Sequence, residues 1–320
     1  MEQFAQKLLD AIKSNKNILL FVHIHPDFDA LGSAFAFKNF IELNFKNKDV
    51  RIAGINKLDT SYLSDFFNRD WLDVSPEFAS DAFCIVFDTA NYERIYQKNL
   101  FHFESSFRID HHLIVEKICE YEFVVPTASS TCELVGILLK YYNLKIDSMI
   151  VNSLYFGILT DTIRFLTSNV NSQTYSIMAY LNDAAKIDKQ MVHNQLYLRN
   201  WKDSKFDSKI SKKIKFSNGF AWLMFDRRFV KKYGCNYLKT KLYLMSNIKE
   251  IKVYALLYFD EISGFYRCSL RSREYNVNQI ATQFSGGGHI YASGCKIDNK
   301  NEFKLLKEKI INLVNTENES

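Results

Sequence analysis

The chain has 320 residues, of which 47% are hydrophobic and 24% are charged, which is the usual balance for a globular protein. Single hydrophobic cores stop growing at about 250–300 residues, so this length allows two domains. No stretch approaches the roughly 18 uncharged apolar residues of a membrane span. Residues 1–5 show neither a basic region nor a cleavage site, so we expect no secretory signal.

Six cysteines are scattered without a C-x-x-C pair, which argues against a zinc knuckle and favours reduced thiols in the cytoplasm. The net charge of +5 is unevenly distributed. Residues 201–250 hold eleven lysines and two arginines against four acidic residues, so the rest of the chain is net negative. This local basic excess favours a polyanionic ligand such as nucleic acid, with a solvated lysine-rich face as the alternative.

The first half of the sequence alternates apolar strands with helices, the pattern of a doubly wound parallel α/β sheet. Strands are predicted at 18–22, 50–54, 82–87 and 106–109, and helices at 3–14, 34–45, 130–142, 151–158 and 172–183. Ser130 and Glu133 predict a capping box at the start of one helix. We assign residues 1–190 to this domain.

The second half predicts a smaller α/β domain with a mixed sheet at 213–320, joined by a polar, lysine-rich linker at 191–212. Its strands are predicted at 220–225, 251–259 and 265–270, and its helices at 276–284 and 304–314. A glycine cluster at 286–288 lies between the two helices.

Acidic and imidazole side chains follow four of the predicted elements of the first domain. They are His23, Asp27 and Asp29 after the first strand, Asp88, then His111 and His112, and finally Asp161. Ligands of open α/β sheets bind outside the carboxyl ends of the strands, so we expect these side chains to meet there. They suit divalent ions, and two ions about 3.5–4 Å apart with a bridging carboxylate need about this many ligands. Capping of a helix start could explain any one of these aspartates, but not the presence of Asp or His in all four segments.

The segments that carry these residues resemble the motifs of a known family. They are H-x-x-P-D-x-D-A-x-G-S at 23–33, F-D-T-A-N at 87–91, D-H-H at 110–112 and G-I-L-T-D-T at 157–162, similar to the four motifs of the DHH phosphoesterase superfamily. The segments at 270–273, 286–289 and 292–294 resemble the DHHA1 substrate-binding domain. The chain is most similar to NrnA-type nanoRNases, which degrade short oligoribonucleotides and dephosphorylate 3′-phosphoadenosine 5′-phosphate (pAp).

The resemblance implies a ligand set for two ions. One ion would be held by His23, Asp27 and Asp88, and the other by Asp29, Asp88, His111 and Asp161. Manganese is the expected ion, although carboxylate and imidazole ligands also admit magnesium, cobalt or zinc. Asp88 would bridge the ions in the catalytic centre. His112 would either donate a proton to the leaving oxygen or orient its neighbour.

The resemblance also implies a substrate-binding set in the second domain. It consists of Arg271, Ser272, Arg273, Gly286, Gly287, Gly288 and His289. Glycine lets backbone N–H groups approach a phosphate, and an arginine can grip it with two hydrogen bonds. A flexible turn is the alternative for the glycines. We expect this domain to hold the end of the substrate remote from the bond that is cut.

Four positions depart from the family pattern: His25, Phe28, Ser285 and the Ile163–Arg164 pair, which replaces a usual glycine. None is a metal ligand. The alternatives are a cyclic or linear dinucleotide phosphodiesterase, a RecJ-like single-strand exonuclease, or a catalytically silent nucleic-acid-binding module. We expect short RNA and pAp as substrates, no membrane association and a homodimer.

Overall fold

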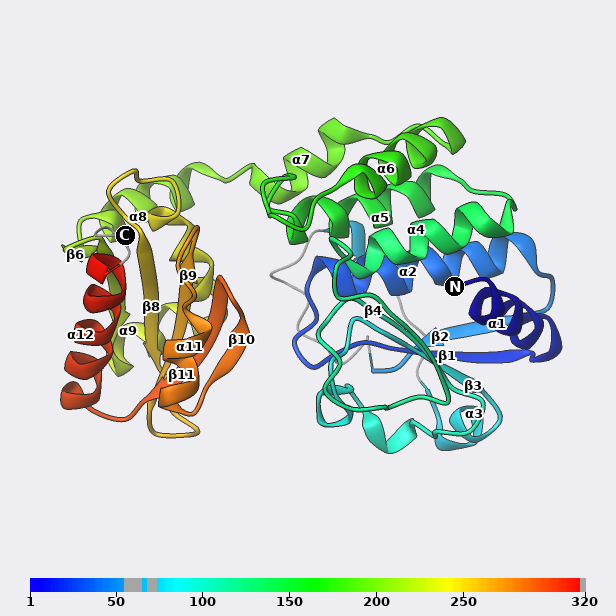
Figure 1. Cartoon of the computed structure of the whole chain (residues 1–320), viewed down its shortest axis with the longest axis horizontal. Helices are drawn as coiled ribbons and strands as arrows, with labels where there is room; N and C mark the ends of the chain where they lie inside the picture. The colour runs from blue at the N-terminus through cyan, green and yellow to red at the C-terminus, as the bar shows by residue number, and fades with distance from the viewer. Residues whose placement is uncertain (55–64, 68–73, 317–320) are drawn as a thin grey trace. The chain divides into compact units, whose positions relative to one another are not determined.

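The computed structural model describes residues 1–54, 65–67 and 74–316. The chain divides into two compact units, the first ending at Leu198 and the second beginning at Arg199 (Figure 1). Much of the segment predicted as a linker is helical, in α7 (Lys189–Tyr197) and α8 (Trp201–Ser211). None of the helices in the described ranges has the length and apolarity needed to cross a bilayer.

The first unit contains a five-stranded sheet in the order β2-β1-β3-β4-β5, with every pair parallel. The strands are β1 (Asn17–Phe21), β2 (Asp49–Ile52), β3 (Phe83–Phe87), β4 (Phe107–Asp110) and β5 (Tyr121–Val124). The chain first runs from β1 outward to β2 and then crosses to β3. The switch point of the topology therefore lies between the carboxyl ends of β1 and β3, where such sheets bind ligands.

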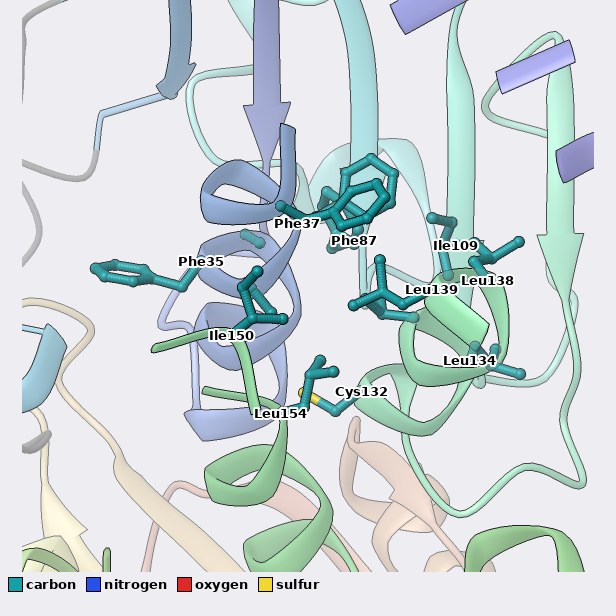
Figure 2. Packing of buried hydrophobic residues seen from close by; sticks show 14 of the residues in the cluster. Phe35, Phe37, Phe87, Ile109, Cys132, Leu134, Leu138, Leu139, Ile150 and Leu154 are labelled. Atoms are coloured by element: carbon teal, nitrogen blue, oxygen red, sulfur yellow. The ribbon is translucent and has the colours of Figure 1, made fainter. Parts of the chain in front are cut away.

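Helices cover one face of this sheet with a large apolar core. They are α1 (Glu2–Ser14), α2 (Phe28–Asn44) and α4 (Thr131–Tyr142), with α5 (Ser148–Asp161) packed on α2 and α4, and α6 (Ser172–Ala184) packed on α4. Figure 2 shows Phe87 and Ile109 of the sheet beneath Phe37 of α2 and Leu139 of α4. The opposite face has a smaller core, which includes Ala79 of α3 (Pro76–Ser80).

The second unit contains a six-stranded mixed sheet in the order β10-β11-β9-β8-β7-β6. The sequence predicted a mixed sheet for this part of the chain. The strands are β6 (Lys215–Ser217), β7 (Phe220–Phe225), β8 (Val253–Phe259), β9 (Tyr266–Ser272), β10 (Gly287–His289) and β11 (Ala292–Ile297). The pair β7–β8 is parallel and the other pairs are antiparallel. The α/β class and the parallel-plus-mixed arrangement are thus confirmed.

Two sets of helices sandwich this second sheet. On one face lie α11 (Asn278–Ala281) and α12 (Lys300–Thr316). On the other face α8, α9 (Arg227–Tyr233) and α10 (Cys235–Lys239) pack over β7 and β8. The glycine cluster is a short edge strand. A Cβ at Gly286 would lie 2.1 Å from the carbonyl oxygen of Gly294, so glycine is required for β10 to approach β11.

Candidate metal centre

The seven polar residues of the first unit converge at the switch point of the parallel sheet. His23 follows β1, Asp88 follows β3, and His111 and His112 follow β4. Asp27 and Asp29 stand at the start of α2, while Asp161 is the last residue of α5. The chain reverses direction at Asp88 through a left-handed backbone conformation with φ of +52°. Asp is among the few residues that tolerate this conformation, and here it turns the carboxylate toward the histidines.

A first group of possible ligands contains His23, Asp27 and Asp88, with one ligand atom from each within 4.8 Å of the others. His23 Nε2 lies 3.5 Å from Asp88 Oδ2. The opposite nitrogen of the ring, Nδ1, lies 2.8 Å from the carbonyl oxygen of Ile24, which directs Nε2 toward Asp88. Asp27 caps α2 through Oδ1, which accepts hydrogen bonds from the backbone N–H groups of Asp29 and Ala30.

A second group surrounds the Nε2 atom of His111. This nitrogen lies 3.4 Å from Asp161 Oδ2, 3.5 Å from Asp88 Oδ1 and 3.8 Å from Asp29 Oδ2. Asp29, His111 and Asp161 offer ligand atoms within 4.8 Å of one another. The two oxygens of Asp88 therefore face different histidines, Oδ2 toward His23 and Oδ1 toward His111.

The amino terminus of α4 holds the two central carboxylates in place. Asp29 Oδ2 accepts a hydrogen bond from the N–H of Thr131 at 2.7 Å, and Oδ1 accepts one from the N–H of Cys132 at 2.9 Å. The Thr131 hydroxyl donates to Asp88 Oδ1 at 3.0 Å. The unpaired N–H groups and the dipole of a helix start stabilise nearby negative charge. Ser130 caps this helix as predicted, but Glu133 bonds to Ser129 instead of closing the capping box.

His112 is oriented by a buried ion pair behind it. Its Nδ1 lies 2.7 Å from Asp110 Oδ1, and the other oxygen of Asp110 accepts a hydrogen bond from Arg108 Nη2 at 2.5 Å. The Arg108 side chain is fully buried in β4 and also donates to the carbonyl oxygens of Ala90 and Glu116. Burial alone would raise the pKa of Asp110, but His112 and Arg108 hold it below its usual range. The ionised Asp110 thus fixes the orientation of the His112 ring through Nδ1.

The charges of the centre are strongly coupled. Burial disfavours the charged form of His23, but Asp88 outweighs it and raises the pKa of His23 to about 9. Burial likewise opposes the charged form of His111, yet Asp161, Asp88 and Asp29 raise its pKa to about 9. Burial and then the charge of Asp88 raise the pKa of Asp29 to about 7, and burial with Asp29 raises the pKa of Asp161. The three histidines overcome burial and keep the pKa of Asp88 below its usual range.

This donor set fits divalent cations. The structure crowds four carboxylates and three imidazoles, that of His112 included, into overlapping groups, all oxygen and nitrogen donors of the kind that Mn²⁺, Mg²⁺ and Co²⁺ accept. The raised pKa values of Asp29 and Asp161 reflect burial first and then the negative charge of neighbouring carboxylates, which His111 offsets only in part. Bound cations would offset the remainder and displace the protons. Metal binding by these residues remains our prediction.

The predicted substrate-binding residues all lie in the second unit. His289 in β10 pairs with Ala292 in β11, which pairs with Arg271 in β9. Residues opposite one another in a sheet point to the same face, so Arg271 and His289 share a face two strands apart. Their spacing of about 10 Å suits one phosphate group with its nucleoside. His289 is exposed, and the Arg271 guanidinium is anchored on the carbonyl oxygens of Leu270 and Ser293.

The other two predicted side chains of this set are occupied in the protein itself. Arg273 donates hydrogen bonds to the carbonyl oxygens of Ser246, Ile248 and Ile251 at 2.6, 3.2 and 2.7 Å. The Ser272 hydroxyl donates to Lys252 and accepts from the N–H of Tyr275. Both side chains therefore support the loop next to β9, and we place the phosphate contact on Arg271.

Sequence reasoning assigned no role to four residues that shape the centre, although two of them lie in the quoted motifs: Arg108, Asp110, Thr131 and Gly157. The signal for Arg108 was a charged residue inside the apolar strand predicted at 106–109.

Gly157 is important because it has no side chain. A Cβ there would lie 2.2 Å from Cys132 Sγ and 2.8 Å from Asp29 Oδ1, so glycine lets α5 pack directly against the metal centre.

Comparison with known proteins agrees with this geometry. Residues 17–158 match the DHH family, N-terminal domain, and residues 238–316 match the DHHA1 domain. A Mycoplasma genitalium protein named uncharacterized protein MG371 is 32% identical over 99% of this chain and 98% of that protein. The bifunctional oligoribonuclease and PAP phosphatase NrnA of the same organism is 31% identical over 92% of each chain. The crystal structure of an exopolyphosphatase-related protein from Bacteroides fragilis, 21% identical, has the same fold with a TM-score of 0.80, covering 98% of both chains.

The chain therefore belongs to the DHH family of phosphoesterases that carry a DHHA1 domain. It is an enzyme of the hydrolase class, and several of its relatives bear the name NrnA. The family predicted from the motifs is confirmed.

We expect Gly157→Ala to weaken metal binding, because the added methyl group would displace Cys132 and the carboxylate of Asp29. Isothermal titration with Mn²⁺ should show affinity reduced by about 10–100-fold, the range seen when support of a metal ligand is lost.

Gly136→Ala is the matched control in the same core. Its Cβ would meet Ile177 Cγ2 at 2.6 Å, away from the carboxylates. It should lower the melting temperature without changing Mn²⁺ affinity. Equal losses of affinity in both variants would contradict a direct role of Gly157 at the metal centre.

Proposed function

We propose that the protein is a two-metal phosphoesterase that degrades short oligoribonucleotides to mononucleotides and dephosphorylates pAp to AMP. The observation that carries the proposal is the position of Asp88 between two groups of ligands, with one oxygen facing His23 and the other facing His111. Such a bridging carboxylate is what a pair of ions requires. Manganese is the ion we expect, with magnesium and cobalt as alternatives.

The residues of the chain would divide the work of phosphate ester hydrolysis. His23, Asp27 and Asp88 would hold one ion, and Asp29, Asp88, His111 and Asp161 the other. When bound, the ions supply Lewis-acid activation of a water molecule and neutralise charge on the phosphate. As the imidazolium, His112 would donate a hydrogen bond from Nδ1 to Asp110 and would give the proton on Nε2 to the leaving oxygen. The phosphorus–oxygen bond breaks as that proton moves to the departing group.

The choice of substrate rests on the relatives and on the second unit. NrnA proteins, including that of Bacillus subtilis at 28% identity, are named for oligoribonuclease and PAP phosphatase activity. Arg271 and His289, in one row of the sheet, would bind a substrate phosphate. We also propose that the protein is a homodimer in the cytoplasm.

The alternative enzymes are a dinucleotide phosphodiesterase and a RecJ-like exonuclease. Hydrolysis of an RNA dimer, an RNA pentamer, pAp and a cyclic dinucleotide with Mn²⁺, compared by kcat/KM, distinguishes them. Preference for the dimer, the pentamer and pAp supports the proposal. Binding of RNA with no hydrolysis of any of the four would instead identify a silent nucleic-acid-binding module.

Asp88→Asn should reduce hydrolysis of all these substrates by more than about 100-fold. This loss is larger than the one usually seen when a residue that only supports a metal ligand is changed. Asn also tolerates the left-handed backbone of this position, so the fold should persist. The measurements are initial rates, bound Mn²⁺ per chain and far-ultraviolet circular dichroism. Retention of activity with normal metal content would contradict the bridging role.

Asp110→Asn should lower kcat on an RNA dimer by about 100-fold, the lower end of the usual contribution of a proton donor. The nucleotide p-nitrophenyl ester, whose leaving group needs no proton, should lose far less activity. Mn²⁺ affinity should be unchanged because Asp110 contacts His112 and Arg108, not the proposed ions. Equal losses on both substrates would show that His112 is not the proton donor.

Arg271→Ala and His289→Ala should each raise KM for pAp by about tenfold or more, since a hydrogen bond to a charged group contributes about 1.5–3 kcal/mol. The number of bound Mn²⁺ ions should stay the same. Arg273→Ala, two residues after Arg271, serves as the control and should change stability more than KM. Loss of metal in the first two variants would show that the site is misplaced.

A further inference from the structure

Helix α8 of the second unit carries a row of lysines on its outer side. Lys202, Lys205, Lys209 and Lys212 are separated by three, four and three residues, so helical geometry places them on one face. Trp201 begins the same row, is 70% exposed and lies under the ammonium group of Lys205 at 5.3 Å. We call these five residues the lysine stripe. It extends about 15 Å along the helix axis.

The acidic residues of α8 do not neutralise the stripe, because they point elsewhere. Asp207 is buried and paired with Lys241 and Arg199. Asp203 accepts hydrogen bonds from the side chains of Asn200 and Tyr237. The outer side of the helix therefore presents positive charge alone, with serines beside it.

The neighbouring helix α9 carries two further exposed lysines. Phe206 of α8 packs on Phe229 and Tyr233 of α9, with ring centroids 6.4 and 4.8 Å apart. The exposed Lys231 and Lys232 lie on that helix. Most of this surface lies between the two matched family segments, which end at residue 158 and resume at residue 238.

The lysine stripe is separate from Arg271 and His289, the proposed phosphate-binding residues of the sheet. Helix α8 packs over β7 and β8 through Ile210, while Arg271 and His289 lie on β9 and β10. Because Ile210 and Phe206 turn toward the sheet, the lysine stripe faces away from it.

We infer that the lysine stripe is a second binding site, for single-stranded nucleic acid longer than the oligonucleotides that are hydrolysed. Lysines about one helical turn apart neutralise successive phosphates, and an exposed tryptophan lets a base stack. A bilayer surface fits less well, because the apolar side of α8 is already packed against β7, β8 and α9. The inference does not depend on which small substrate the metal centre cleaves.

The test measures binding of a 20-nucleotide RNA and of the DNA of the same sequence, both labelled at each end, to the full-length protein with Mn²⁺. Gel analysis confirms that the probes stay intact. For four phosphate contacts, the logarithm of the binding constant should fall with the logarithm of salt concentration with a slope of about −3. The two probes show which sugar is preferred, and tight, stripe-dependent binding of either supports the inference.

Replacing the four lysines by glutamine preserves helix propensity and removes the charges. This variant should bind the probe at least about tenfold more weakly, with a salt slope near zero, while hydrolysing an RNA dimer normally. Trp201→Ala should weaken binding by at least about fivefold.

The matched control replaces Lys300, Lys304, Lys307 and Lys309 of α12 by glutamine, the same change in charge on the other face of the sheet. It should bind like the wild type. Equal weakening in both quadruple variants would overturn the inference, because net charge alone would then explain binding. Stripe-dependent binding to vesicles of anionic lipid without binding to either probe would also overturn it.

Discussion

The contact on which the rest of the first unit depends is that of one buried carboxylate, Asp88, with two histidines from different strands. For Asp88 to meet both histidines, β1, β3 and β4 must end at the same edge of the sheet. The parallel arrangement of the strands provides this. The contact also requires a left-handed turn immediately after β3. An isolated buried carboxylate is costly, so its neighbours must compensate it. The imidazoles, the Thr131 hydroxyl and the proposed cations all serve that purpose.

Around this carboxylate the helices act as rigid supports. The start of α4 fixes Asp29 with two backbone N–H groups, and the close packing of α2 against α5 brings Asp161 to the opposite side. At Gly32 a Cβ would lie 2.5 Å from the carbonyl oxygen of Ser153, so this packing depends on glycine as much as on apolar burial. The large apolar core beneath keeps the helices in place. The packing of these helices therefore determines where Asp29 and Asp161 lie.

Much of this arrangement could be predicted from the sequence. Buried parallel strands appear as short apolar runs, and the polar residues that follow them mark the ligand edge; hence His23, Asp88 and His111 were found. Strand β5 was missed because all four of its residues are only partly buried and give no apolar run. The role of Arg108 could not be predicted, because it depends on Asp110, Ala90 and Glu116 meeting in space. The hydrogen bonds of Arg273 to the carbonyl oxygens of Ser246 and Ile251 could not be predicted for a similar reason, since only the fold brings these groups together.

After Asp161, three consecutive residues, Ile163, Arg164 and Phe165, adopt positive φ angles of 49°, 65° and 65°. Each such residue costs about 1–2 kcal/mol relative to a right-handed conformation, and a β-branched isoleucine is the least suited. A glycine at the first of these positions would remove that cost there. The chain thus maintains strain beside a proposed ligand, and the surrounding contacts must hold it there. A single substitution in this loop can therefore change how rigidly Asp161 is held without altering any of the proposed ligands. Evolution could adjust the metal centre in this way.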